Sequence, residues 1–141
     1  MKATDWAYLA GVLDSDGCVT IGKSDSKGRS YYRLCVHITN TSRELIDWLA
    51  TFFGGTIYLS NPNSPKHYKS AWRWSVRGRD ASPILWGVLP YLRVKRERAE
   101  LGLQFIKTMD RSPQLLTDKQ VKQRERIHAI LRSMNQLGRV R

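Results

Sequence analysis

The chain is predicted to have an α+β fold in which helices pack against an antiparallel sheet. Two observations support this prediction. The hydrophobic period along the 141 residues changes repeatedly between about 3.6 and about two, and polar turns divide the period-two stretches into pairs of neighbouring strands. The resulting order of elements is αββαββα, followed by additional C-terminal helices. Because a chain of this length typically forms one domain, we expect residues 1–141 to be a single domain.

The first helix is predicted over about residues 4–16. Trp6, Leu9 and Leu13 recur at helical spacing and indicate the side that faces a core. Small residues spaced i, i+4 and i+8 form a narrow stripe along the helix, and they are Ala7, Gly11 and Ser15. Such a stripe would let a second helix pack with its backbone close to the first.

Two hairpins and the remaining helices follow. The hairpin strands are predicted over residues 18–24 and 31–39, and over residues 56–60 and 68–77. Between the hairpins, a Thr41–Glu44 capping box opens a helix that ends at Gly54. Further helices are predicted from Ser82, near 93–109 and near 118–135, with a turn at Ser112–Pro113 between the last two.

Basic residues are concentrated in the two hairpins. Regions 17–40 and 55–79 contain nine Lys or Arg residues and one acidic residue, Asp25, and the whole chain has a net charge of +12. Outward basic and polar side chains on strands suit the major groove of DNA, because they reach phosphates and base edges. The alternative is a solvated sheet face, which would normally mix both signs of charge. The residues predicted to contact DNA are Lys23, Arg29, Tyr31, Arg33, His37, Lys69, Arg73, Ser75 and Arg77.

Other features of the sequence argue against membrane, secreted and zinc-binding proteins. No window approaches the roughly 18 apolar residues of a membrane span, and the N-terminus lacks the apolar core of a signal peptide. We therefore expect an intracellular protein, in an organelle such as a chloroplast or mitochondrion or in bacterial or phage cytoplasm. Cys18 and Cys35 match neither a disulfide framework nor the paired spacing of a zinc site, so both are expected to be free thiols.

The end of the first helix resembles a known motif. Residues 9–17 read Leu-Ala-Gly-Val-Leu-Asp-Ser-Asp-Gly, and six of these nine positions are identical to the motif that names the LAGLIDADG homing endonucleases. The order of elements also resembles the fold of that family, in which an antiparallel, saddle-shaped sheet lies over DNA. With one motif, the chain resembles the homodimeric branch, in which the stripe of small residues on the motif helix forms the interface.

The resemblance assigns roles to residues at matching positions. It implies that Asp16 is the metal-binding catalytic carboxylate and that the backbone carbonyl of Ser15 is a further ligand. The role of Asp14 stays open. Asn40 matches the position of an amide that orients the attacking water, where the family often has Gln. Lys95 matches the active-site lysine, which stabilises charge on the phosphate.

The implied reaction is metal-dependent hydrolysis of both strands of a long, roughly palindromic DNA site, leaving 3′ overhangs. The implied cofactor is Mg²⁺, or another divalent cation such as Mn²⁺. Arg93 is the alternative to Lys95. Two other functions stay open: an RNA maturase that binds its own intron RNA and needs no metal site, and a DNA-binding regulator that does not cut.

Overall fold

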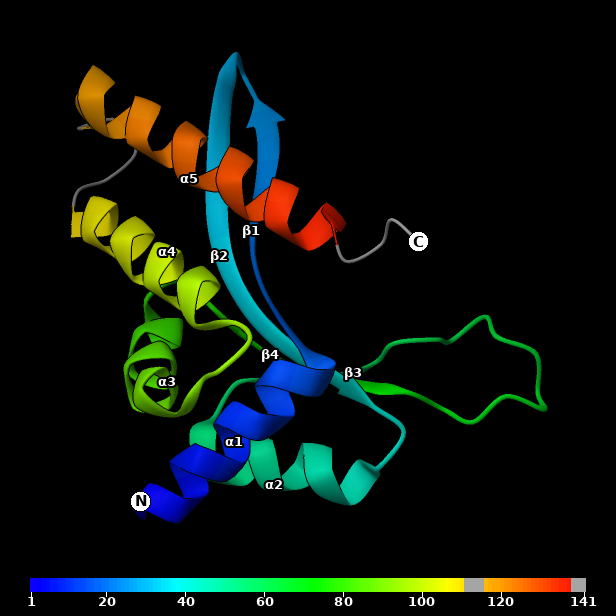
Figure 1. Cartoon of the computed structure of the whole chain (residues 1–141). Helices are drawn as coiled ribbons and strands as arrows, with labels where there is room; N and C mark the ends of the chain where they lie inside the picture. The colour runs from blue at the N-terminus through cyan, green and yellow to red at the C-terminus, as the bar shows by residue number, and fades with distance from the viewer. Residues whose placement is uncertain (111–115, 138–141) are drawn as a thin grey trace.

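The computed structural model describes residues 1–110 and 116–137, and the predicted order of helices and strands is confirmed (Figure 1). In chain order the elements are α1 (Ala3–Asp16), β1 (Gly17–Ser26), β2 (Arg29–Asn40), α2 (Arg43–Phe53), β3 (Thr56–Leu59), β4 (Trp72–Arg77), η1 (Gly78–Asp80), α3 (Ala81–Val88), η2 (Leu89–Tyr91), α4 (Arg96–Lys107), η3 (Thr108–Asp110) and α5 (Asp118–Leu137), where η denotes a 3₁₀ turn. The predicted turn at Ser112–Pro113 lies outside the described residues. None of the helices described is long and apolar enough to cross a membrane.

The four strands form one antiparallel sheet in the order β1-β2-β4-β3. The long strands β1 and β2 curve away from the shorter pair (Figure 1). They are joined by a tight turn in which Lys27 and Gly28 have φ angles of 51° and 75°. Two successive positive φ values match the right-handed twist of a hairpin, so the strands extend further into the turn than the sequence predicted.

The second hairpin is shorter than predicted. Residues 60–71 form an exposed connection, so the return strand begins at Trp72 rather than at residue 68. The Asn61 side chain closes this connection, because its amide donates to the Lys69 carbonyl (2.9 Å) and its oxygen accepts from the Ala71 N–H (2.8 Å). These side-chain bonds replace the strand pairing that the sequence suggested.

One face of the sheet packs against the helices, and the buried strand residues alternate as predicted. The hydrophobic core includes residues from all five α-helices and from three of the strands, and its sheet members include Val19, Ile21, Leu34, Val36, Ile38, Trp74 and Val76. Trp74 is fully buried, and its indole N–H donates to the Gly54 carbonyl. α5 packs across β1 (Figure 1), and the Asn135 amide near its end donates to the Val19 carbonyl (3.1 Å). This bond gives a partner to one carbonyl of the edge strand β1.

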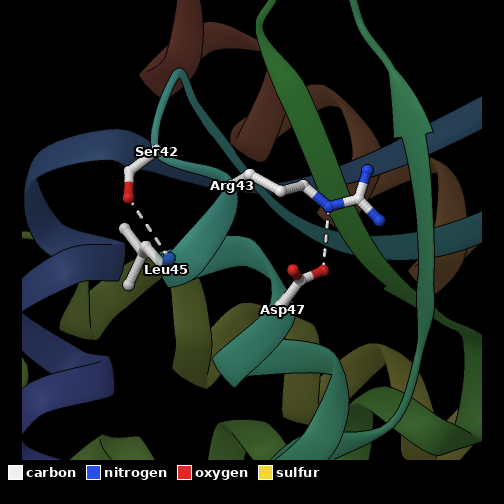
Figure 2. Close-up of polar contacts among 4 residues, drawn as sticks. All are labelled: Ser42, Arg43, Leu45 and Asp47. Atoms are coloured by element: carbon white, nitrogen blue, oxygen red, sulfur yellow. Dashed lines mark hydrogen bonds and ion pairs between the residues drawn. The ribbon is translucent and has the colours of Figure 1, made fainter.

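The start of α2 lies one residue later than predicted. Ser42, not Thr41, is the N-cap residue, and its hydroxyl accepts from the Leu45 N–H at 3.3 Å. Figure 2 shows this bond together with the ion pair of the first turn, in which Arg43 Nε donates to Asp47 at 2.8 Å. The Arg43 guanidinium also lies 4.3 Å from the centre of the Trp72 ring. The first turn of α2 is therefore held by a cap, an ion pair and a contact with β4.

Candidate active site and nucleic-acid interface

Asp16 is the last residue of α1, at the point where the helix passes directly into β1. Its side chain is exposed, and Oδ2 accepts a hydrogen bond from Asn40 Nδ2 at 3.0 Å. Gly17 makes the direct passage possible: a Cβ there would lie 2.4 Å from Leu13 Cδ1 and 2.8 Å from the Leu13 backbone. The final glycine of the motif therefore brings the Asp16 carboxylate to the junction of α1 with the sheet.

Asn40 is the last residue of β2, and both ends of its amide are engaged. Its Oδ1 accepts from the Ser42 N–H at 2.7 Å, while Nδ2 points to Asp16. Since Nδ2 carries two N–H groups, one of them remains after the bond to Asp16. The structure thus brings Asn40 and Asp16 together, and the role of Asn40 in orienting water stays a prediction.

Lys95 reaches the same end of α1 from the segment before α4. Its Nζ donates to the carbonyl oxygens of Leu13 (2.9 Å) and Asp14 (2.8 Å), two of the last carbonyls of the helix. A cation is favoured there by the negative end of the helix dipole. Burial lowers the pKa of Lys95 from its ordinary value, and Arg98 adds to this effect, whereas Cys18, Asp14 and Asp16 act in the opposite direction.

Asp14 has a function in the structure that the sequence left open. Its carboxylate accepts three consecutive backbone N–H groups, from Arg93 (2.9 Å), Val94 (3.2 Å) and Lys95 (2.9 Å). Residues 93–95 are therefore held in a non-helical path, and α4 begins at Arg96 rather than at residue 93 as predicted. The sequence offered only one signal for this contact, a second acid at an unfavourable helix end.

The stripe of small residues on α1 lies on the surface of the chain. Ala7, Gly11 and Ser15 are all exposed, and a Cβ at Gly11 would have nothing within 4 Å. The Ser15 hydroxyl donates back to the carbonyls of Gly11 (3.1 Å) and Val12 (3.2 Å) within the helix. Contacts within the chain thus do not require a glycine at position 11.

The sheet face that points away from the core carries most of the residues predicted to contact DNA. The strand register places them side by side on that face, and they are Arg29, Tyr31, Arg33, His37, Arg73 and Arg77. Arg33 and Arg77 are exposed, while Arg73 is ordered by a hydrogen bond from Nε to Thr39 Oγ1 at 2.9 Å. The result is a basic strip across β2 and β4.

Three residues of the predicted contact set differ from the prediction in position or exposure. Lys23 pairs with Tyr32, on the same face as the core residue Ile21, because its position in β1 differs by one from the outward series. Ser75 is only 2% exposed, and its hydroxyl is hydrogen-bonded with Thr56 on the neighbouring strand (3.2 Å). Lys23 is therefore exposed but lies on the opposite face from the outward series, whereas Ser75 points outward as predicted but is buried. Lys69 is exposed, but it lies in the 60–71 connection rather than on β4.

His37 lies in the middle of this face and is half-buried. Burial lowers its pKa to about 4, with further contributions from Arg73 and Lys95. Its Nδ1 is buried without a hydrogen-bond partner among the residues described. At neutral pH His37 is thus uncharged, so it can donate or accept a hydrogen bond but adds no positive charge against phosphate.

An open cavity of about 760 Å³ extends from this face to α5. It is lined on the sheet side by residues that include Cys18, His37 and Arg73, and on the α5 side by His128 and Arg132. This wall was not predicted from the sequence, although Arg124, His128 and Arg132 recur every four residues along the predicted helix. The structure separates the three, because Arg124 is buried and donates to the Thr108 carbonyl and hydroxyl.

The structure is similar to those of several solved homing endonucleases. I-CvuI, solved in complex with its target in the presence of Ca, gives a TM-score of 0.63 at 25% sequence identity, over 75% of this chain and 68% of I-CvuI. The archaeal intron-encoded homing endonuclease I-Vdi141I, complexed with DNA, gives a TM-score of 0.78 at 12% identity, over 92% of this chain and 83% of the other. The LAGLIDADG homing endonuclease I-GzeII, in complex with its DNA target, gives 0.69 at 19% identity, over 86% of this chain and 42% of the other.

No protein-family model and no curated protein sequence matches the chain. The structural likeness nevertheless agrees with the motif, which lies at the end of α1 and supplies Asp16 to the candidate site. The fold class is thus that of DNA-binding homing endonucleases. Within that class, the fold is similar to that of the LAGLIDADG homing endonuclease I-GzeII, and residues 9–17 carry one copy of a sequence that resembles the LAGLIDADG motif.

Proposed function

We propose that the chain is a site-specific DNA endonuclease that hydrolyses both strands of its target. The observation that carries the proposal is the convergence of Asp16, Asn40 and Lys95 at the C-terminal end of α1. The basic strip on β2 and β4 adds a surface suited to the DNA backbone, since Lys and Arg contacts to phosphates supply much of the affinity of such proteins. I-CvuI and I-GzeII, which are similar in structure, were solved bound to their DNA targets.

The donors at this end of α1 fit a hard divalent cation, and we propose Mg²⁺, with Mn²⁺ as a substitute. Asp16 and the Ser15 carbonyl would provide oxygen ligands. Within residues 1–110 and 116–137, no group of three or more His, Cys, Asp or Glu side chains could hold a metal ion. Because Mg²⁺ is usually held by one or two carboxylates together with water and phosphate oxygens, a pair of Asp16 side chains from two copies would suffice. When bound, the ion would polarise the phosphoryl oxygens and stabilise the leaving oxygen.

Two further side chains would act on the same phosphate. We propose that the remaining Nδ2 N–H of Asn40 orients the attacking water, because Asp16 and Ser42 hold the rest of the amide. The Lys95 ammonium has three N–H groups, and two are bonded to the carbonyls of α1. The third is available to stabilise negative charge that develops on the phosphate.

We propose that two copies of the chain pack through α1. The stripe of Ala7, Gly11 and Ser15 is exposed, and the open space at Gly11 would admit the backbone of a second helix. Such packing would bring two Asp16 carboxylates to one place and would align two basic strips along a single duplex. Two-fold symmetry of the protein would then impose two matching half-sites on the target.

The proposal is tested with a randomised duplex library, incubated with the protein in the presence and absence of Mg²⁺, and followed by sequencing of cut ends. We expect metal-dependent cuts at one long, roughly palindromic site, leaving 3′ overhangs. Asp16→Asn should abolish cutting and leave binding largely intact. Asp47→Asn, which removes the same charge from an exposed ion pair on α2, is the matched control and should cut normally.

Cutting by Asp16→Asn at the wild-type rate would refute the assignment of this carboxylate. If the wild-type protein binds duplex DNA and does not cut it with either Mg²⁺ or Mn²⁺, the nuclease proposal fails. Intron RNA would then be the next ligand to test, because a maturase of this fold would keep the basic surface.

A further inference from the structure

Asp14 and Lys95 hold each other by opposite ends. The Asp14 carboxylate accepts the backbone N–H groups of Arg93, Val94 and Lys95, while the Lys95 ammonium donates to the backbone carbonyls of Leu13 and Asp14. The result is a closed clamp between the C-terminal turn of α1 and the segment that leads into α4. Both oxygens of the Asp14 carboxylate are used within it.

We propose that Asp14 is a positioning residue for Lys95, and that it places the Lys95 ammonium beside Asp16 for the reaction. This inference rests on the proposed nuclease function. A lysine side chain is a flexible four-carbon stem, so fixing the ammonium requires that the backbone of the residue be fixed as well. Asp14 provides this, since it binds the N–H of Lys95 itself and the two N–H groups before it.

The location of Asp14 supports positioning over direct action on the DNA. Its side chain is half-buried, whereas that of Asp16 is exposed at the end of the same helix. The carboxylate lies at the negative end of the α1 dipole, which is unfavourable, but also at the N-terminal end of α4, where free N–H groups favour an anion. Its three bonds all go to the residues that precede α4, so removal of the carboxylate should release the segment that carries Lys95.

A double-mutant cycle on the single-turnover cleavage rate tests whether Asp14 acts through Lys95. The substrate is the duplex recovered from the library, and the proteins are wild type, Asp14→Ala, Lys95→Met and the double variant. We expect Asp14→Ala to slow cleavage on the order of 10²-fold, since a displacement of about 1 Å can cost that much. The double variant should be no slower than Lys95→Met alone, and DNA affinity measured without divalent cation should change less than about twofold. Multiplicative effects of the two substitutions would overturn the proposal.

A second measurement does not depend on cleavage. Reductive methylation of the metal-free protein, read by mass spectrometry, reports how accessible each lysine ammonium is. Lys95 should react slowly in the wild type and several-fold faster in Asp14→Ala, while Asp47→Ala should leave it unchanged. Equal labelling of Lys95 in the wild type and Asp14→Ala would overturn the proposal even if the protein cuts DNA. Conversely, a protein that cuts no duplex yet shows the faster labelling would refute the nuclease function and leave the clamp established.

Asp14→Asn serves as the second variant if Asp14→Ala does not fold. Asn keeps one acceptor oxygen, but its NH₂ group would face an N–H donor of residues 93–95. We expect an intermediate cleavage rate and intermediate labelling of Lys95. A rate equal to that of the wild type with unchanged labelling would contradict the proposed need for both oxygens.

Discussion

The substitution Gly11→Ala should stabilise the isolated chain but weaken the proposed dimer, so it distinguishes between the two. In an exposed helix interior, Gly→Ala stabilises by about 1 kcal/mol, because glycine loses more backbone freedom on folding. A Cβ at Gly11 would meet nothing within 4 Å in the protomer, so Gly11→Ala should raise protomer stability by about that amount. If two α1 helices pack through this position, however, the same methyl group enters the interface once from each copy.

The expected loss of dimer affinity follows from the cost of overpacking the interface. Extra methyl groups in a tightly packed site typically cost about 1–3 kcal/mol each, and 1.4 kcal/mol corresponds to tenfold in a dissociation constant. We therefore expect Gly11→Ala to raise the dimer dissociation constant at least about tenfold, as measured by sedimentation velocity over a concentration series. Ser133→Ala, at an exposed position of α5, is the control for helix propensity and should leave dimerisation unchanged. An unchanged dissociation constant together with a more stable protein would refute packing through Gly11.

Three further predictions concern stability. Gly17→Ala should destabilise the protein by about 1–3 kcal/mol, because its Cβ would overlap the Leu13 backbone, and calorimetry would detect the lower Tm. The pKa of His37 is lowered to about 4, so between pH 6.5 and 4 the unfolded chain binds a proton that the native state does not. The free energy of unfolding should therefore fall by about 1–2 kcal/mol as the pH is lowered from 6.5 to 4, after allowance for solvent screening. In urea denaturation at a series of pH values, His37→Gln should reduce this pH dependence. Arg124→Met should cost about 1–3 kcal/mol in urea denaturation, because it leaves the buried Thr108 carbonyl and hydroxyl without this donor; a cost near zero would show that water replaces it.

The features that sequence predicted well are those that depend on neighbouring residues. The order of helices and strands follows from hydrophobic period, and the end of α2 follows from Gly54, whose φ of 71° is one that other residues rarely adopt. The start of α5 is equally local: Thr117 and Gln120 each accept a hydrogen bond from the backbone N–H of the other. Asp16 was found through a motif of nine adjacent positions.

The features that sequence missed depend on pairing across the fold. The placement of Lys23 was wrong because a shift of one position along a strand exchanges the two faces, and composition does not specify that shift. Ser75 lies on the outward face yet is buried, because Thr56 on the adjacent strand covers its hydroxyl. The contact of Asp14 with residues 93–95 joins positions about 80 apart in the chain, so no local pattern could indicate it.

Helix α1 combines features that the proposed dimer would explain. The stripe of small residues is exposed, Asp16 is exposed, and no group of three potential metal-binding side chains is present in the described residues. A second copy packed on α1 would account for all three at once. Two copies would also double the positive charge in a small volume, which disfavours association unless a polyanion is present. Dimerisation and DNA binding should therefore be linked: the dimer dissociation constant should decrease on addition of target duplex, and should do so less at high salt, because the duplex then binds more weakly.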